Sequence, residues 1–142
     1  MKLLIDTNII IDYLADRAPF AAYAEKVIDL CATGEAEGML TANSATDIYY
    51  IIRKVAGRDA ALRHMKALFD VLGITDVGRG DILHAMEMDM QDFEDALAAV
   101  CAKRASADFI VTRDGKGFKD APVPSISPTD LLRRFFPYMI DA

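Results

Sequence analysis

The chain has little of what marks several common classes of protein. Its two cysteines, Cys31 and Cys101, are too few and too far apart for a disulfide framework or a zinc site, so we expect two buried free thiols. Its two histidines, His64 and His84, stand alone in helical stretches with no second histidine at ligand spacing. Five prolines and eight glycines are too few for a linker-rich chain, and 53% hydrophobic residues exclude disorder. The 142 residues therefore predict one domain, 1–142.

Long apolar runs and an excess of positive charge are also missing. No stretch approaches the roughly 18 apolar residues of a membrane span, and Asp6 interrupts the apolar N-terminal segment where a signal peptide needs an unbroken core. We therefore expect a cytoplasmic protein with no membrane partner. The net charge of −6 argues against a protein that holds nucleic acid by overall electrostatics. It does not exclude nucleic-acid chemistry at an acidic site, because a bound metal ion reverses the local sign.

Two familiar catalytic motifs are absent. The chain has no G-x-x-x-x-G-K-[ST] phosphate loop, and Ser44 has no partnered histidine for a Ser-His-Asp triad.

The order of predicted elements indicates the fold. Short apolar runs predict strands at 2–5, 38–41, 74–77, 108–112 and 123–126. Apolar periodicity and end signals predict helices at 9–15, 19–33, 44–56, 59–72, 81–89, 92–106 and 128–136. Apolar strands separated by helices predict a parallel sheet covered on both faces, so we expect a three-layer α/β/α sandwich of about five strands.

Residues at the helix ends add detail to this expectation. Thr7 and Asn8 are expected to cap the first helix, and Asn43 or Ser44 the helix that begins near residue 44. Gly34 and Gly57 are expected to end the helices that precede them.

Four acids stand where the predicted strands and helices meet one edge of the sheet. Asp6 and Asp114 follow the first and fourth strands, while Asp47 and Asp95 lie one turn into helices that begin near the same edge. Each alone also fits a turn or a helix N-terminus. Asp6 and Asp95, however, lie in apolar segments, where burying a carboxylate is costly unless a cation or hydrogen-bond donors compensate it. An all-oxygen set of this kind suits Mg²⁺ or Mn²⁺.

Three neighbouring residues have two interpretations each. Asp92 lies three residues before Asp95, so it is either the helix cap or a rival third acid, and we favour the cap. Asn8 and Thr112 either hydrogen-bond an acid or a metal-bound water, or serve as turn and cap residues.

The segments LLIDTNIIIDYL, DFEDALAAVCAKRASADFIVTRDGKGF and VPSISPTDLL resemble the PIN domain family over essentially the whole chain. This resemblance implies an α/β/α metal-dependent ribonuclease, in many bacterial members the toxin of a toxin–antitoxin pair. It implies catalytic, metal-binding roles for Asp6, Asp47, Asp95 and Asp114. The family often has Glu at the second position, so Asp47 is expected to reach the metal through a water. An RNA substrate, an antitoxin and a homodimer are the implied partners.

Cationic and apolar residues suggest where such partners bind. Arg53 and Lys54 in one helix, and Arg113 and Lys116 beside Asp114, are candidates for holding RNA phosphates, although a solvated helix face explains the first pair as well. The methionine-rich turn at 86–90 and the apolar residues within 48–52 (Ile48, Tyr49, Ile51 and Ile52) are expected to form partner surfaces.

Two other functions remain open. The position of Asp6 after the first strand resembles that of the nucleophile in phosphatases that form an aspartyl-phosphate. Those enzymes need a second acid two residues later, and this chain has Asn8 there. The chain could also be a catalytically weak or inactive PIN-like domain that acts as a nucleic-acid or protein binding module.

Overall fold

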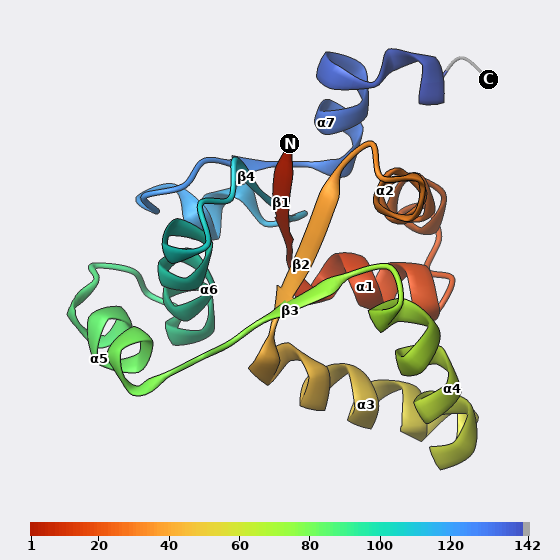
Figure 1. The fold of residues 1–142 in the computed structure, drawn as a ribbon, viewed down its shortest axis with the longest axis horizontal. Helices are drawn as coiled ribbons and strands as arrows, with labels where there is room; N and C mark the ends of the chain where they lie inside the picture. The colour runs from red at the N-terminus through yellow and green to blue at the C-terminus, as the bar shows by residue number, and fades with distance from the viewer. Residues whose placement is uncertain (141–142) are drawn as a thin grey trace.

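A five-stranded parallel sheet forms the centre of the computed structural model, which describes residues 1–140 (Figure 1). The strands are β1 (Lys2–Ile5), β2 (Glu37–Thr41), β3 (Gly73–Thr75), β4 (Phe109–Val111) and β5 (Ser125–Ile126). They lie in the order β3-β2-β1-β4-β5, and every neighbouring pair is parallel. In the central strand, Leu4 lies opposite Met39 of β2 and Ile110 of β4. The strands thus follow the predicted order but are mostly shorter than the apolar runs suggested.

Seven α-helices cover the sheet. They are α1 (Thr7–Leu14), α2 (Ala21–Thr33), α3 (Ala42–Ala56), α4 (Arg58–Phe69), α5 (Arg79–Glu87), α6 (Phe93–Arg104) and α7 (Pro128–Phe135). Two short 3-10 helices that the sequence did not predict, η1 (Gly115–Phe118) and η2 (Pro137–Met139), follow β4 and α7.

The helices form a layer on each face of the sheet. Leu3 and Leu40 face α1 to α4 and α7 in the main core cluster. Leu4 and Ile110 face the opposite way, toward α6, and α5 packs outside α6 on that side (Figure 1). Most side chains of the central strands are buried on both faces, as expected for a parallel sheet, while Ile74 of the edge strand β3 is exposed. The predicted three-layer α/β/α sandwich is confirmed.

The chain changes direction across the sheet between β1 and β4. From β1 it passes outward to β2 and β3 through helices on one face, and it then returns to β4, on the other side of β1, through α5 and α6 on the opposite face. Ligand sites of open α/β sheets lie at such a reversal, beyond the carboxyl ends of the strands. Asp6 and Asp114 follow the two strands that flank it.

The helix ends correct part of the prediction. Asp6, not Thr7 or Asn8, caps α1, because its carboxylate accepts the Thr7 backbone N–H. Helix α3 begins at Ala42, so Ser44 lies inside it rather than at its cap.

Other details agree with expectation. Gly34 has the predicted left-handed conformation that ends α2, and Gly57, also at positive φ, ends α3. Cys31 and Cys101 are buried free thiols, and burial raises the pKa of Cys31 to about 11. Within residues 1–140, none of the helices is both long enough and apolar enough to cross a membrane.

Candidate metal centre

Asp6 lies at the end of β1, held by two hydrogen bonds. Its carboxylate accepts the backbone N–H of Thr7 at 2.8 Å and the hydroxyl of Thr112 at 2.7 Å. The Thr112 hydroxyl in turn accepts the backbone N–H of Asp114 at 3.0 Å, so one hydroxyl links the segments after β1 and β4. Burial raises the pKa of Asp6 despite these bonds, and the Asp114 and Asp92 charges raise it further. Within residues 1–140, no cationic side chain forms an ion pair with Asp6.

Asn8 also contacts this linkage. Its side-chain amide donates to the Thr112 hydroxyl at 3.5 Å, while its carbonyl oxygen is buried without a hydrogen-bond partner among the described residues. Of the predicted supporting residues, Thr112 thus bonds an acid directly and Asn8 through Thr112.

Asp95 is brought to the same edge by the first turn of α6. Asp92 caps this helix, since its carboxylate accepts the Asp95 backbone N–H at 2.9 Å, as the favoured interpretation predicted. Burial raises the pKa of Asp95 to about 6, and the negative charges of Asp92, Asp6 and Asp114 add to the shift. These are the signs of carboxylates close enough to repel one another.

Gly117 shows how closely Asp95 and Asp114 approach. A Cβ atom at this glycine would lie 2.6 Å from Oδ2 of Asp114 and 2.7 Å from Oδ2 of Asp95. A side chain at this position would force the carboxylates to shift, so the glycine lets η1 pass close to both in their present orientation. The Gly117 N–H donates to the Asp114 carboxylate at 3.2 Å, which fixes that side chain at the start of η1.

Asp47 reaches the site from α3, on the far side of a cleft of about 430 Å³. This cleft is also lined by Asp6, Asp95 and Glu94. The Asp47 carboxylate shares a hydrogen bond with Glu94, and this bond is the largest cause that raises the pKa of Glu94 to about 7, ahead of burial and the surrounding negative charges. The sequence analysis missed Glu94, although its place beside Asp95 in the DFED stretch was a usable signal.

The predicted acids are divided between two adjoining hollows. Asp6 and Asp47 line the cleft beside α3, Asp92 and Asp114 line a second one of about 390 Å³ beside η1, and Asp95 lines both. Among the described residues, no three acid, histidine or cysteine side chains stand close enough together to hold one ion. To share an ion, carboxylates must rotate toward it about their side-chain torsions.

A chain of hydroxyl groups supports the wall of the first cleft. The Ser44 hydroxyl accepts the hydroxyl of Thr7 at 2.9 Å and lies 2.8 Å from the hydroxyl of Thr41. These contacts join the starts of α1 and α3 at the edge where the acids lie. They give Ser44 a structural role that the sequence did not indicate.

Arg113, a candidate for holding RNA phosphates, is paired with an acid of the fold. Its guanidinium binds the buried Asp12 of α1 with two hydrogen bonds, at 2.6 and 3.2 Å, and lies over the ring of Phe20 at 4.0 Å. Only 31% of the Arg113 side chain is exposed. Arg113 therefore anchors the loop that carries Asp114 to α1, and its charge is neutralised there.

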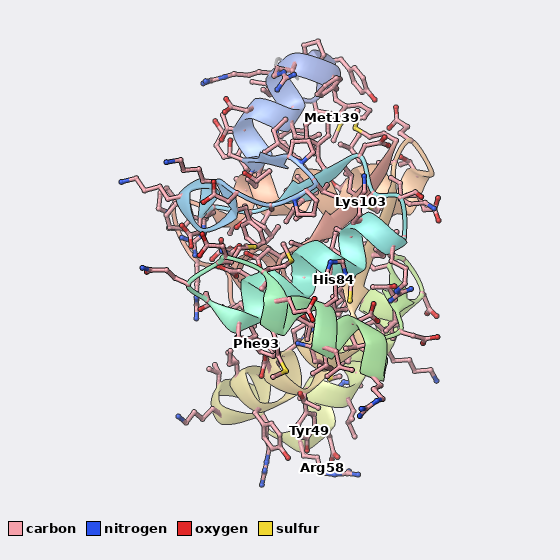
Figure 2. The ribbon with its side chains drawn as sticks, turned by 90° about the vertical axis from the view of Figure 1, so that its left-hand side faces the viewer. Tyr49, Arg58, His84, Phe93, Lys103 and Met139 are labelled. Atoms are coloured by element: carbon pink, nitrogen blue, oxygen red, sulfur yellow. The ribbon has the colours of Figure 1, made fainter. Side chains whose placement is uncertain are left out.

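The remaining cationic candidates are exposed. Arg53 and Lys54 lie in the last turn of α3, and Lys116 lines the second hollow with Asp114. Figure 2 shows the start of α6, marked by Phe93, on the side of α3 that carries the cleft, and Lys103 at the far end of α6.

The predicted partner surfaces are partly wrong. Ile48 and Ile52 are buried in the core, because they face the sheet side of α3. Ile51 is exposed as predicted, together with Tyr50 and Val55, which were not predicted. In the methionine turn, Met86 is exposed, while Met88 and Met90 pack on the clusters around α6.

The chemistry of this donor set fits a hard cation. Carboxylate oxygens held near one another are the ligands that Mg²⁺ and Mn²⁺ prefer and that softer metals do not. Gly117 leaves open the space between two of the carboxylates that a side chain would fill. Asp6, Asp95 and Asp114 could share such an ion after their carboxylates rotate toward one another, and Asp47 lines the cleft from α3.

These features define a class of protein: a parallel α/β/α sandwich with a group of acids where the strand order reverses. The profile of the PIN domain family matches residues 2–116, and the chain belongs to this family.

Solved structures of bacterial toxin–antitoxin proteins have the same fold. VapBC2 from Rickettsia felis, solved bound to a promoter DNA fragment, has a TM-score of 0.70 at 17% identity, over 89% of this chain and 98% of that one. A toxin–antitoxin complex from Klebsiella pneumoniae has a TM-score of 0.69 at 18% identity, over 89% of this chain and 97% of that one. VapC20 of Mycobacterium tuberculosis, a sarcin-ricin loop cleaving toxin, has a TM-score of 0.66 at 16% identity, over 85% of this chain and 95% of that one. A search of curated proteins found no match.

Proposed function

We propose that the protein is a divalent-metal-dependent endoribonuclease and the toxin of a bacterial toxin–antitoxin pair. The observation that carries the proposal is the group of Asp6, Asp95 and Asp114 at the reversal of the sheet, with raised pKa values for Asp6 and Asp95 and no basic partner among the described residues. A stable protein keeps such groups together at a cost, and a bound cation removes that cost.

The residues around the acids have separable tasks. Thr112 orients the Asp6 carboxylate, and the Asp92 cap fixes the first turn of α6 and with it Asp95. Asp47 and its partner Glu94 close the side of the cleft toward α3. Mg²⁺ or Mn²⁺ in such a site lowers the pKa of a water and neutralises charge that develops on a phosphodiester.

The substrate must approach an anionic cleft, so RNA needs cationic contacts outside it. Arg53 and Lys54 of α3, and Lys116 beside Asp114, are exposed and lie on the two flanks of the acids. We assign RNA phosphates to these three side chains, since local positive charge attracts a polyanion even to a net-negative protein. Arg113 is not among them, because Asp12 neutralises it.

The proposed protein partners are an antitoxin and a second copy of the chain. Family membership and the toxin–antitoxin complexes that share the fold support the antitoxin. Exposed Val55 of α3 and Met86 of α5 support a homodimer, since apolar side chains on a surface favour association. Light scattering at high micromolar concentration tests the dimer, and a monomer there contradicts it.

The direct test is cleavage of a panel of RNA oligonucleotides with Mg²⁺, with Mn²⁺ and with chelator. We expect cleavage only with metal, and its loss in Asp6→Asn and Asp114→Asn while circular dichroism shows an unchanged fold. Equal cleavage by the three proteins would contradict the proposal. Metal-independent RNA binding without cleavage would support the alternative, a binding module whose site is inactive.

A further inference from the structure

Tyr50 is a large aromatic side chain that α3 holds at the edge of the acid-lined cleft. It is 61% exposed, yet it lines the same cleft as Asp47 and Asp95. Its ring forms a T-shaped pair with the ring of half-buried Tyr49, with centroids 5.1 Å apart and planes at 78°. Tyr50 therefore presents a braced aromatic surface beside the acids. Figure 2 shows Tyr49 on α3, the helix below the start of α6.

The position of Tyr50 on α3 places it between an acid and a cation on the same face of the helix. Asp47, Tyr50 and Lys54 follow the i, i+3, i+7 spacing, so the three share one face of α3. Asp47 and Tyr50 line the cleft, and Lys54 is exposed one turn beyond Tyr50. An acid, an aromatic ring and a cation thus follow one another along the edge of the cleft.

We propose that Tyr50 is a stacking platform for one unpaired base of the RNA substrate, next to the phosphodiester held over the acids. The inference rests on the proposed function and adds a requirement to it. RNA must be single-stranded at this point, because the faces of bases in a duplex are covered by their neighbours.

A ring suits this place better than a hydrogen-bonding or charged side chain. The floor of the cleft is anionic, and stacking on a neutral ring needs no positive charge and accepts any of the four bases. Asp47 and Tyr50 are three residues apart, about 4.5 Å along the helix axis. Lys54 is then placed for the next phosphate along the strand.

Binding of a short single-stranded RNA that contains 2-aminopurine tests the proposal, since stacking on an aromatic ring quenches this base. The measurement uses the full chain with Mn²⁺ and carries Asp95→Asn, so that the RNA stays intact. Tyr50→Leu is compared with Tyr50→Phe, which keeps the ring. Tyr138→Leu is the matched control, because Tyr138 is 53% exposed but lies on η2, away from the cleft.

We expect Tyr50→Leu to lose the quenching and to weaken binding by about fivefold to 150-fold, the usual value of one stacked base. Tyr50→Phe and Tyr138→Leu should bind and quench like their parent. Unchanged quenching in Tyr50→Leu overturns the proposal, as does an equal loss in Tyr50→Phe. Loss of a dimer in Tyr50→Leu with unchanged RNA binding also overturns it and assigns Tyr50 to a protein interface.

A parallel assay separates this inference from the proposed function. The chain with intact acids is tested for metal-dependent cleavage of the same RNA. If the chain with intact acids cleaves the RNA and Tyr50→Leu leaves the quenching unchanged, the stacking proposal is wrong and the nuclease proposal stands. Absence of cleavage contradicts the proposed nuclease activity, whereas the quenching assay still decides whether Tyr50 stacks on a base. Absence of any RNA binding by the parent contradicts both.

Discussion

Asp6 and Asp12 lie on the same short segment and meet opposite electrostatic conditions. Asp12 is fully buried, but the guanidinium of Arg113 binds it at 2.6 Å. Asp6, at the start of the same helix, receives only uncharged donors, and its nearest titratable neighbours are other acids. The chain places Arg113 directly before Asp114, yet the side chain turns inward to Asp12. The fold neutralises the inner acid, whereas the acids at the edge would be neutralised by the metal ion that we propose.

The ion pair between Asp12 and Arg113 gives the largest expected effect, a loss of folding stability. Asp12→Ala leaves Arg113 without its partner in a partly buried place, which typically costs about 3–5 kcal/mol. We expect the free energy of unfolding in urea to fall by about 3 kcal/mol, the lower end, because Arg113 is 31% exposed. The double variant Asp12→Leu/Arg113→Met, which removes both charges, should recover much of the loss. A loss below about 1 kcal/mol in Asp12→Ala would mean that the pair does not anchor the loop.

Asp92 and Asp95, at the start of α6, separate a structural role from a role in metal binding. Asp92→Asn keeps a capping side chain, so we expect only a small change in stability and less than about threefold in RNA cleavage. Asp95→Asn should lower cleavage and Mn²⁺ affinity by about 100-fold, since even groups that only support a metal ligand are worth about 10–100-fold. Titration calorimetry and cleavage rates measure both. The reverse ranking would make Asp92 the ligand and Asp95 the structural residue.

The smallest expected effect is a pH dependence of the metal-free protein. The raised pKa values of Glu94, about 7, and Asp95, about 6, mean that these groups bind protons more tightly in the folded state. Their protonation stabilises the fold at low pH, and that contribution is lost as the pH rises through 6 and 7. In chelator, the Tm should therefore fall between pH 5 and pH 8. The double variant Glu94→Gln/Asp95→Asn should show a smaller fall, and an equal fall would contradict the raised pKa values.

The sequence was sufficient for features that depend on nearby residues. The alternation of apolar runs and helical stretches predicted the sandwich, and the position of Asp6 and Asp114 after strands predicted which edge they share. The cap formed by Asp92 could be predicted because its partner N–H lies three residues away. Such features need only the period of a strand or a helix.

Features set by distant partners could not be predicted in this way. Arg113 is adjacent to Asp114 in sequence, but its partner Asp12 is 101 residues away, and only the fold decides which acid it meets. Glu94 and Asp95 are neighbours in sequence, yet helical geometry turns them about 100° apart, so Glu94 meets Asp47 and Asp95 meets η1. The burial of Ile48 and Ile52 likewise depended on which side of α3 faces the sheet.

Thermal unfolding of the wild type and Asp6→Asn, each in chelator and in excess Mn²⁺, tests the central claim most directly. Asn keeps a cap on α1 but removes one of the repelling charges, so in chelator Asp6→Asn should melt higher than the wild type. Mn²⁺ should raise the Tm of the wild type, because a ligand of the folded state adds RT ln(1 + [L]/Kd), and it should raise that of the variant less. A lower Tm for Asp6→Asn in chelator, with a wild type that Mn²⁺ leaves unmoved, would contradict a metal site at these acids.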